Sequence, residues 1–250
     1  MMEKTLAVIP ARGGSVRVPR KNIKLLNDKP LIAYAIEAAK EAKTIDRIIV
    51  STDDDEIKRV AIGYGAEVPF MRRADISEDV PTEEVALHAV EWLKNNDSYS
   101  PDLLVCLEPP VPFRKAKHID RCVKSIVADR DVDSALTVTS VRGYRPEWMV
   151  RIGADNLITP YTDHFTREGE ALLKFPASQG FEPLYRAVGH VFSCRTSTLK
   201  KYKSFVGRKC MAIEIDGKDA FDLDYPEDFE ICEILIKKYL VQERGHIPDD

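Results

Sequence analysis

The chain has 250 residues, of which 44% are hydrophobic and 31% charged, and its formal net charge is −4. These fractions are typical of a folded soluble domain, and a chain of this length can bury a large core without disulfide bonds or structural metal ions. The weakly acidic total argues against a nucleic-acid-binding protein, because such proteins normally carry a basic surplus that neutralises phosphates.

The cysteines also restrict the class of protein. There are five, widely spaced and without a C-x-x-C pair, which disfavours zinc ribbons and secreted disulfide frameworks. No apolar stretch approaches the roughly 20 residues that a membrane span needs, and the apolar run near the N-terminus is too short for a signal peptide. We therefore expect a cytoplasmic protein with neither a membrane nor a nucleic acid as partner.

Strand and helix signals alternate along the first half of the chain. Buried strands are predicted at Thr5 to Ile9, Asp46 to Ser51, Val68 to Met71 and Leu103 to Leu107. Helices are predicted at Pro30 to Lys43, Asp54 to Gly63, Glu83 to Asn95 (capped by Thr82) and Ala116 to Ala128. Strand, loop and helix in repeated order indicate an α/β fold with a doubly wound, mainly parallel sheet.

The pattern changes after a predicted strand at Ser134 to Val141. Residues 142–186 hold many aromatic residues among turns and short alternating stretches, so we predict an inserted arm within a single domain that spans residues 1–250. The core pattern then resumes with a strand at Ala187 to Cys194, a helix near Thr196 to Tyr202, a strand at Met211 to Ile215 and a terminal helix from about Pro226.

A glycine pair with four cations follows the first predicted strand. The cations Arg12, Arg17, Arg20 and Lys21 surround Gly13, Gly14 and Ser15. Glycine lets backbone N–H groups approach an anion closely, and four cations within ten residues can neutralise a polyphosphate. The spacing matches neither the Walker nor the dinucleotide pattern. Taken alone, the segment is equally consistent with a solvated basic turn.

A carboxylate pair, Asp222 and Asp224, follows a late strand. On extended chain, residues two apart point the same way, so both carboxylates can face one hard cation while Leu223 turns into the core. Mg²⁺ commonly takes one or two protein carboxylates and completes its shell with phosphate oxygens and water. Glu227 and Asp228 instead complement the start of the terminal helix. With the cationic loop on the same sheet edge, the pair indicates phosphoryl or nucleotidyl transfer.

Several motifs carry a resemblance to a known family. They are IPARGGS at 9–15 with PRKNI at 19–23, PLIAY at 30–34, IVSTD at 49–53 and FDLDYPEDF at 221–229. Together they resemble the CMP-sugar synthetases, the acylneuraminate cytidylyltransferase family. The resemblance implies a Rossmann-like nucleotidyltransferase that converts CTP and a 2-keto sugar acid, a nonulosonate such as sialic acid or a relative, into a CMP-sugar and pyrophosphate with Mg²⁺.

The resemblance also implies roles for individual residues. The nucleotide-binding set would be Ala11, Arg12, Gly13, Gly14, Ser15, Lys21, Asn22, Arg72 and Thr82, and the substrate-binding set Glu108, Arg114 and Gln179. Asp222 and Asp224 would hold the metal. Arg12 and Lys21 would stabilise charge as the anomeric hydroxyl of the sugar attacks the α-phosphorus. The inserted arm implies a homodimer.

Three departures from the family pattern concern the sugar more than the nucleotide. Val16 and Arg17 stand where the family usually has Lys-Gly, and Glu108 stands where a loop usually begins with Gln. A carboxylate at the expected sugar site repels a sugar acid unless it is protonated or turned away. The family's Arg-Arg-Gln stretch before the late strand is not evident in this chain, where only Gln179 and Arg186 lie nearby.

Two alternatives stay open. A 3-deoxy-manno-octulosonate cytidylyltransferase shares the Ser-x-Arg-x-Pro-x-Lys framework that Ser15 to Lys21 displays. A nucleotide-sugar-binding protein or glycosyltransferase would use D-x-D to hold a sugar nucleotide without forming it. The FDLDYPED segment and the RKN after Pro19 favour the first family, and release of pyrophosphate from CTP separates both enzymes from the binding protein.

Overall fold

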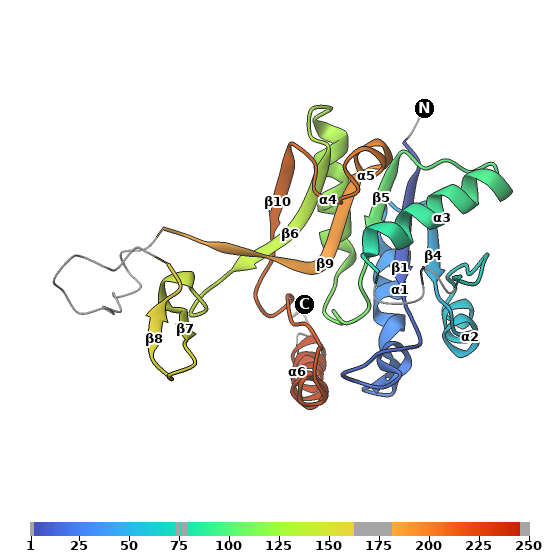
Figure 1. The fold of residues 1–250 in the computed structure, drawn as a ribbon. Helices are drawn as coiled ribbons and strands as arrows, with labels where there is room; N and C mark the ends of the chain where they lie inside the picture. Colours follow the sequence, from blue (N-terminus) through green and yellow to red (C-terminus); the bar gives the residue numbers. More distant parts are fainter. Residues whose placement is uncertain (1–2, 74–75, 77–79, 163–181, 246–250) are drawn as a thin grey trace, which may run out of the picture.

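A six-stranded sheet lies at the centre of the computed structural model, which describes residues 3–73, 76, 80–162 and 182–245 (Figure 1). The strands are β1 (Thr5–Pro10), β4 (Arg47–Ser51), β5 (Leu103–Cys106), β6 (Ser134–Ser140), β9 (Tyr185–Arg195) and β10 (Cys210–Glu214). They are arranged in the order β10-β6-β9-β5-β1-β4. Only β9 runs antiparallel to its neighbours among these pairs, so the predicted mainly parallel sheet is confirmed.

Both faces of the central strands are buried. In β1, Ala7 and Ile9 belong to one apolar cluster, whereas Leu6 and Val8 belong to another on the opposite face. All four side chains are at most 1% exposed. This arrangement follows from the twofold alternation of side chains along a strand, and it explains why the strand is a continuous apolar run, as parallel strands covered on both faces usually are.

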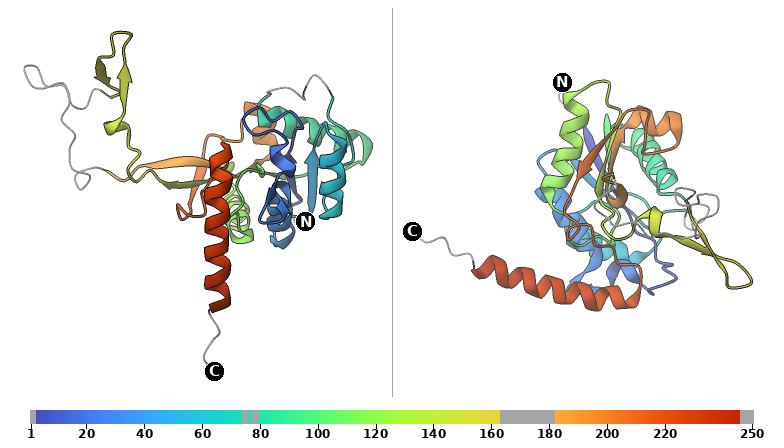
Figure 2. Two further views of the ribbon diagram at one scale, coloured as in Figure 1. Left: turned by 90° about the horizontal axis from the view of Figure 1, so that it is seen from below. Right: turned by 90° about the vertical axis from the view of Figure 1, so that its left-hand side faces the viewer.

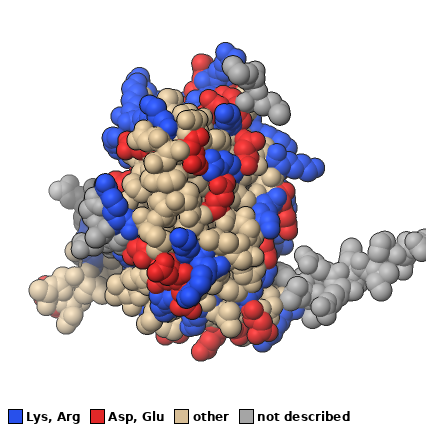
Figure 3. Space-filling model, turned by 90° about the vertical axis from the view of Figure 1, so that its right-hand side faces the viewer, with Lys and Arg blue, Asp and Glu red and all other residues tan. Residues whose placement is uncertain are grey.

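Helices pack on each face of the sheet and complete the doubly wound fold (Figures 1 and 2). One face is covered by α1 (Leu31–Glu41), α2 (Asp55–Gly63) and α4 (Ala116–Ala128), and the other by α3 (Thr82–Asn96) and α5 (Thr196–Tyr202). On the side of the molecule where α2 and α3 lie, basic and acidic side chains alternate (Figure 3). Among the described residues, no helix is both long and apolar enough to cross a membrane.

A third apolar cluster attaches the terminal helix α6 (Pro226–Gly245) to the beginning of the chain. Phe229 and Cys232 of α6 pack with Leu223, Val18 and Leu31. Three short elements lie between β1 and α1, namely η1 (Lys21–Ile23), β2 (Leu25–Leu26) and β3 (Lys29–Pro30). The cluster therefore joins the segment that carries the carboxylate pair to the segment that carries the cations.

The described part of the predicted arm extends away from the sheet (Figures 1 and 2). It leaves from β6, forms η3 (Pro146–Trp148) and a hairpin of β7 (Val150–Ile152) with β8 (Ile158–Pro160), and returns through β9. Large apolar side chains of this hairpin are exposed, with Ile152 at 70% and Leu157 at 66%.

Two local predictions are wrong. Residues 68–71 form no strand; a single bridge between Ile49 and Glu67 is all the sheet pairing there. Pro69 explains this result, because proline has no N–H with which to extend a ladder. Thr82 is the first residue of α3 rather than its cap, and Pro81, with φ −55°, stands in the cap position.

Candidate functional site

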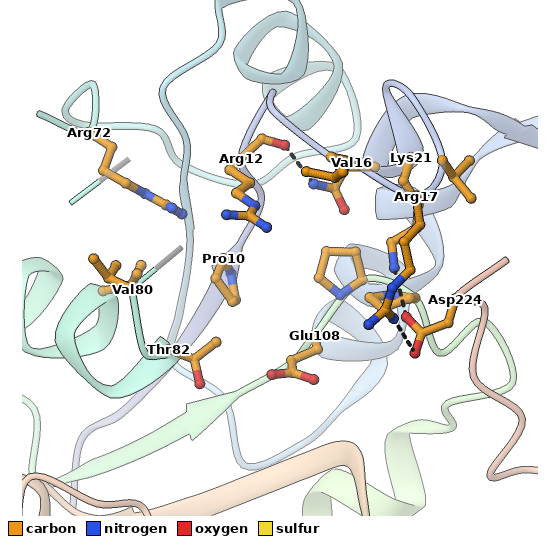
Figure 4. Close-up of a pocket in the computed structure, with 16 residues that line it drawn as sticks. Pro10, Arg12, Val16, Arg17, Lys21, Arg72, Val80, Thr82, Glu108 and Asp224 are labelled. Carbon is orange, nitrogen blue, oxygen red and sulfur yellow. Dashed lines mark hydrogen bonds and ion pairs between the residues drawn. The ribbon is translucent and has the colours of Figure 1, made fainter. Parts of the chain in front are cut away.

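A cavity of about 550 Å³ opens at the carboxyl ends of β1 and β5, where open α/β sheets bind ligands (Figure 4). It is lined by Pro10, Arg12, Ser15, Val16, Arg17, Val18, Lys21, Asn22, Arg72, Val80, Thr82, Val85, Glu108, Pro109, Pro110 and Asp224. In Figure 4, Arg72, Val80 and Thr82 border one side and Arg17, Lys21 and Asp224 the opposite side. Segments far apart in the sequence thus share one site.

The glycine loop, residues 11–20, forms the upper wall of this site in Figure 4. Ala11 is fully buried and its N–H donates to the Ser51 carbonyl at 2.9 Å. The Asn22 amide donates to the Arg12 carbonyl at 2.9 Å, which closes the base of the loop. Both residues belong to the predicted nucleotide-binding set, and these contacts give them a positioning role in the loop.

The two glycines differ in their surroundings. The Gly13 N–H donates to Asp53 Oδ1 at 2.8 Å, and a Cβ at this position would lie 2.9 Å from Asp54 Oδ2. A side chain at 13 would therefore press on Asp54, the cap of α2. A Cβ at Gly14 would meet no atom within 4 Å. Neither glycine lines the cavity, whereas Ser15 does.

Of the four cations predicted to form a cluster, three line the cavity. They are Arg12, Arg17 and Lys21. Arg20 has a left-handed backbone conformation, with φ 58°, and its guanidinium forms ion pairs with Asp54 and Glu56. Arg20 therefore contacts the start of α2 and does not line the cavity.

Arg72, expected at the nucleotide, supplies a further cation from outside the loop. It is 7% exposed, and its Nη2 donates to the Ser51 carbonyl at 2.6 Å while its Nε donates to Ser51 Oγ at 3.2 Å. Burial lowers its pKa from 12.5. Thr82 reaches the same side of the cavity from the first turn of α3. The structure thus brings Arg12, Lys21, Arg72 and Thr82 together, as the sequence predicts.

The segment of the carboxylate pair turns Leu223 into the core, as predicted, but of the two carboxylates only that of Asp224 lines the cavity. Leu223 is fully buried, and its N–H donates to the Pro110 carbonyl at 2.9 Å. Asp224 faces the cavity, whereas Asp222 does not line it. Burial and the neighbouring Asp224 raise the pKa of Asp222, although the residue as a whole is exposed to solvent. Asp228 accepts from the N–H groups of Asp224 and Tyr225, both at 2.7 Å, and so fixes the turn before α6.

Asp224 is paired with two of the cations. Arg17 Nη1 lies 3.2 Å from Asp224 Oδ2, and Lys21 Nζ lies 3.3 Å from Oδ1. Lys21 also donates to the Leu223 carbonyl at 3.0 Å. The pairing of Arg17 with Asp224 is a contact that the motifs did not indicate, because it joins opposite ends of the chain.

The donor set fits a hard divalent cation in part. The described residues contain no group of three or more His, Cys, Asp or Glu side chains placed to hold a metal ion. Asp222 and Asp224 do provide two carboxylates, and their mutual repulsion contributes to the raised pKa of Asp222. A cation held by these carboxylates would relieve that repulsion, and Mg²⁺ needs no more than one or two protein carboxylates when phosphate and water complete its shell.

The predicted substrate-binding residues are separated in the structure. Glu108 lines the cavity. Arg114 is 5% exposed and lies behind the wall, where it donates to the carbonyls of Glu108 and His190. It therefore supports the Pro-rich loop and contributes no lining to the cavity. Gln179 lies outside the described residues.

Comparisons with known proteins agree with this geometry. Residues 6–149 match the family model described as Cytidylyltransferase. The CMP-N,N'-diacetyllegionaminic acid synthase of Legionella pneumophila is 30% identical over 239 residues, which cover 94% of this chain and 97% of that protein. The chain belongs to the cytidylyltransferase family. The resemblance seen in the motifs is thereby confirmed.

Other relatives match this cytidylyltransferase less completely. The pseudaminic acid cytidylyltransferase of Campylobacter jejuni is 44% identical over 111 residues, 44% of this chain and 47% of that protein. The N-acylneuraminate cytidylyltransferase of Escherichia coli is 29% identical over 239 residues, which cover 95% of this chain and 53% of that protein.

Solved structures confirm the nucleotidyltransferase fold. CMP:2-keto-3-deoxy-manno-octonic acid synthetase complexed with CTP aligns with a TM-score of 0.68 at 16% identity, covering 94% of this chain and 99% of that one. The 4-diphosphocytidyl-2C-methyl-D-erythritol synthase of Anaerococcus prevotii aligns with a TM-score of 0.59 at 15% identity, covering 94% and 99%. At these identities the likeness concerns the fold alone.

Proposed function

We propose that this cytidylyltransferase joins CTP to a 2-keto sugar acid of the nonulosonate type, giving a CMP-sugar and pyrophosphate. The observation that carries the proposal is the meeting of Arg12, Arg17 and Lys21 with Asp224 in one cavity of about 550 Å³. Side chains that can neutralise a triphosphate and a carboxylate that can bind a metal thus line the same cavity. Relatives named for legionaminic, pseudaminic and N-acylneuraminic acids support the acceptor class.

The residues of the chain have separate tasks in this reaction. Arg12 and Lys21 neutralise the phosphate oxygens, so that charge which develops as the anomeric hydroxyl attacks the α-phosphorus is stabilised by groups already in place. Arg72, held by Ser51, borders the side of the cavity that also has Val80 and Thr82. We assign the nucleoside to that side, since the opposite side carries the ion pairs of Asp224.

We further propose that Asp222 and Asp224 hold Mg²⁺. When bound, this ion supplies charge neutralisation of the phosphates and lowers the pKa of the attacking hydroxyl. Before it binds, Asp224 is shared by Arg17 and Lys21. With a metal at Asp224, these two cations would be available to neutralise the triphosphate.

Two features support a homodimer that acts in the cytoplasm. The hairpin of the arm exposes apolar side chains, among them Ile152, Leu157 and Ile158, and an exposed apolar patch of this kind commonly marks a protein–protein contact. All five cysteines are free, and Cys106, Cys122, Cys194 and Cys232 are buried. Free thiols are typical of a reducing compartment.

The two alternatives have less support. A 3-deoxy-manno-octulosonate cytidylyltransferase is favoured by the Ser15 to Lys21 framework and by the fold, but the corresponding solved structure is only 16% identical. A protein that binds a sugar nucleotide without making it gains no support from the relatives, which are named as a synthase and as cytidylyltransferases.

A pyrophosphate-release screen tests the proposal. CTP and the other nucleoside triphosphates are each combined with Mg²⁺ and a panel of nonulosonates and 3-deoxy-manno-octulosonate. We expect release only with CTP, and faster release with a nonulosonate. Release that needs no sugar would indicate hydrolysis, a preference for 3-deoxy-manno-octulosonate would establish the first alternative, and no release with any pair would favour the binding protein.

A further inference from the structure

The carboxylate of Glu108 lines the cavity without a partner. Throughout the described part of the chain, no side chain or backbone N–H donates to it and no cation forms an ion pair with it. Two other carboxylates are paired: Asp224 has Arg17 and Lys21, and Asp219 has Lys115. A half-buried carboxylate that lacks donors is costly, so the cavity is built to receive a donor from a ligand.

The position of this carboxylate is fixed by the wall behind it. Arg114 donates to the backbone carbonyls of Glu108 and His190, which ties the loop after β5 to β9. A Cβ at Gly189 would clash with Oε2 of the Glu108 side chain. Gly189 belongs to the part of β9 where the pairing with β6 shifts register. The strand therefore leaves a space that the Glu108 carboxylate occupies.

The charges around Glu108 indicate which ligand supplies the donor. Burial, followed by the negative charge of Asp222, raises the pKa of Glu108 to about 6, so the group is mostly ionised at neutral pH. Lys21 is also among its electrostatic neighbours. Glu108 thus lies beside the phosphates and metal that we propose, but its own charge repels a triphosphate. In CTP the ribose lies between the base and the α-phosphorus, whereas the acceptor sugar is next to the α-phosphorus that it attacks. The acceptor sugar is therefore the ligand that supplies a donor beside the phosphates.

We propose that Glu108 is a specificity-determining residue that accepts a hydrogen bond from an N–H or O–H group of the acceptor sugar acid. This inference rests on the proposed function. Because a carboxylate has two acceptor oxygens and bonds most strongly to a charged donor, an acceptor with a positively charged amino group at the contacting position binds more tightly than one with a hydroxyl, and a deoxy acceptor binds most weakly. The acceptor's own carboxylate turns toward the cations of the glycine loop.

The test compares acceptors that carry an amino group, a hydroxyl or hydrogen at the same carbon. KM and kcat are measured for wild type, Glu108→Gln and Glu108→Ala. A hydrogen bond to a charged group contributes roughly 10- to 100-fold in affinity, so both substitutions raise the KM of the amino acceptor by about that factor and abolish most of the preference over the deoxy acceptor. The KM for CTP changes less than about 2-fold.

Two further variants control the experiment. Gly189→Ala keeps the carboxylate but displaces it, and we expect the same loss of acceptor preference; this variant carries the test if a substitution at 108 prevents folding. Glu91→Gln removes an exposed carboxylate on α3 outside the cavity and leaves both KM values unchanged. Thermal unfolding verifies that each variant is folded.

The outcomes separate the two proposals. An unchanged amino-to-deoxy ratio in folded, active variants overturns the inference about Glu108 and leaves the proposed function intact. A rise in the KM for CTP with no change for the acceptor also overturns it, because Glu108 then contacts the nucleotide. Wild-type protein that releases no pyrophosphate with any acceptor overturns the proposed function itself.

Discussion

Asp224 is the residue at which the two charged groups of the site meet. It follows Leu223, which the core holds, and it precedes a turn fixed by Asp228. Its carboxylate is shared by Arg17 and Lys21. Its backbone is thus held from both sides, so removal of the charge alters the chemistry without disturbing the fold.

Asp224→Asn is therefore expected to lower turnover on the order of 100-fold, because the ligand that we propose for the metal, whose charge acts on the transition state, is lost. Pyrophosphate release at saturating CTP measures this effect, and Mn²⁺ or excess Mg²⁺ shows whether metal affinity is involved. Asp28→Asn, an exposed carboxylate with φ 62° that asparagine tolerates, is the matched control. Full turnover of the Asp224 variant would contradict the metal assignment.

Residue-level prediction from sequence succeeded where backbone periodicity decides the outcome. The alternation around Leu223 is an example, since an extended chain places neighbouring side chains on opposite sides. It failed for Arg20, which is adjacent to Lys21 but turns to Asp54 through a left-handed backbone conformation. That direction depends on a partner in α2, which local sequence does not reveal.

The glycine loop is the element that brings a cation to Asp224. Arg17 lies in the cavity, forms an ion pair with Asp224 and stacks its guanidinium 5.4 Å from the centre of the Tyr225 ring. We expect the guanidinium of Arg17 to exchange its contact with Asp224 for one with the triphosphate when the nucleotide binds.

Arg17→Gln should raise the KM for CTP about 10-fold, the magnitude of one charge-assisted hydrogen bond, and Arg17→Lys should recover part of the loss. Steady-state kinetics at fixed acceptor concentration provide the measurement. Arg59→Gln, which removes an exposed arginine of α2, serves as control. If Arg17→Gln left the KM for CTP unchanged, the loop would bind the triphosphate without Arg17.

A buried histidine pair joins α4 to β9. The rings of His118 and His190 lie 4.8 Å apart, and His118 faces Asp219, which Lys115 also contacts. Burial lowers the pKa of His118 to about 4 and that of His190 to about 2. An unfolded chain binds protons at histidine from about pH 6.5 downward, so acid favours the unfolded state.

The free energy of unfolding should accordingly be constant above about pH 6.5 and fall below it, by up to about 1.4 kcal/mol per pH unit for each histidine. Glu108 opposes this fall between about pH 6 and 4.5, because its raised folded-state pKa lets the folded state bind a proton first. Urea unfolding at pH 7.5, 6.5 and 5.5 measures the slope. His190→Leu should reduce it, and an identical slope would show that His190 is not responsible.

At the scale of the whole molecule, the hairpin of the arm leaves apolar side chains exposed in the part of the chain that the structure describes, with Ile152 at 70% and Leu157 at 66%. Ile152→Asp should therefore convert the proposed dimer to monomer, measured by light scattering after size exclusion. Ile62→Asp, at a similarly exposed isoleucine of α2 (52%), is the matched control. A wild-type protein that is monomeric at micromolar concentration would contradict the role given to the arm.

The fold as a whole was predictable because its strands and helices have distinct periodicities and alternate along the chain. The direction of β9 was not, because a strand's residues do not encode whether it runs parallel or antiparallel. It returns from the arm, and so it enters the sheet opposite to β5 and β6. Gly189, a lone glycine within this strand, was the one available signal of a close approach.

The central claim is that the cavity joins CTP to a 2-keto sugar acid, and product analysis tests it most directly. The protein is incubated with CTP, Mg²⁺ and the preferred acceptor, and mass spectrometry and a pyrophosphate assay follow the reaction. We expect a CMP-sugar whose mass equals that of CTP plus the acceptor less pyrophosphate, formed in equal amount to pyrophosphate. Pyrophosphate accompanied by free CMP alone, or CTP left intact, would contradict it.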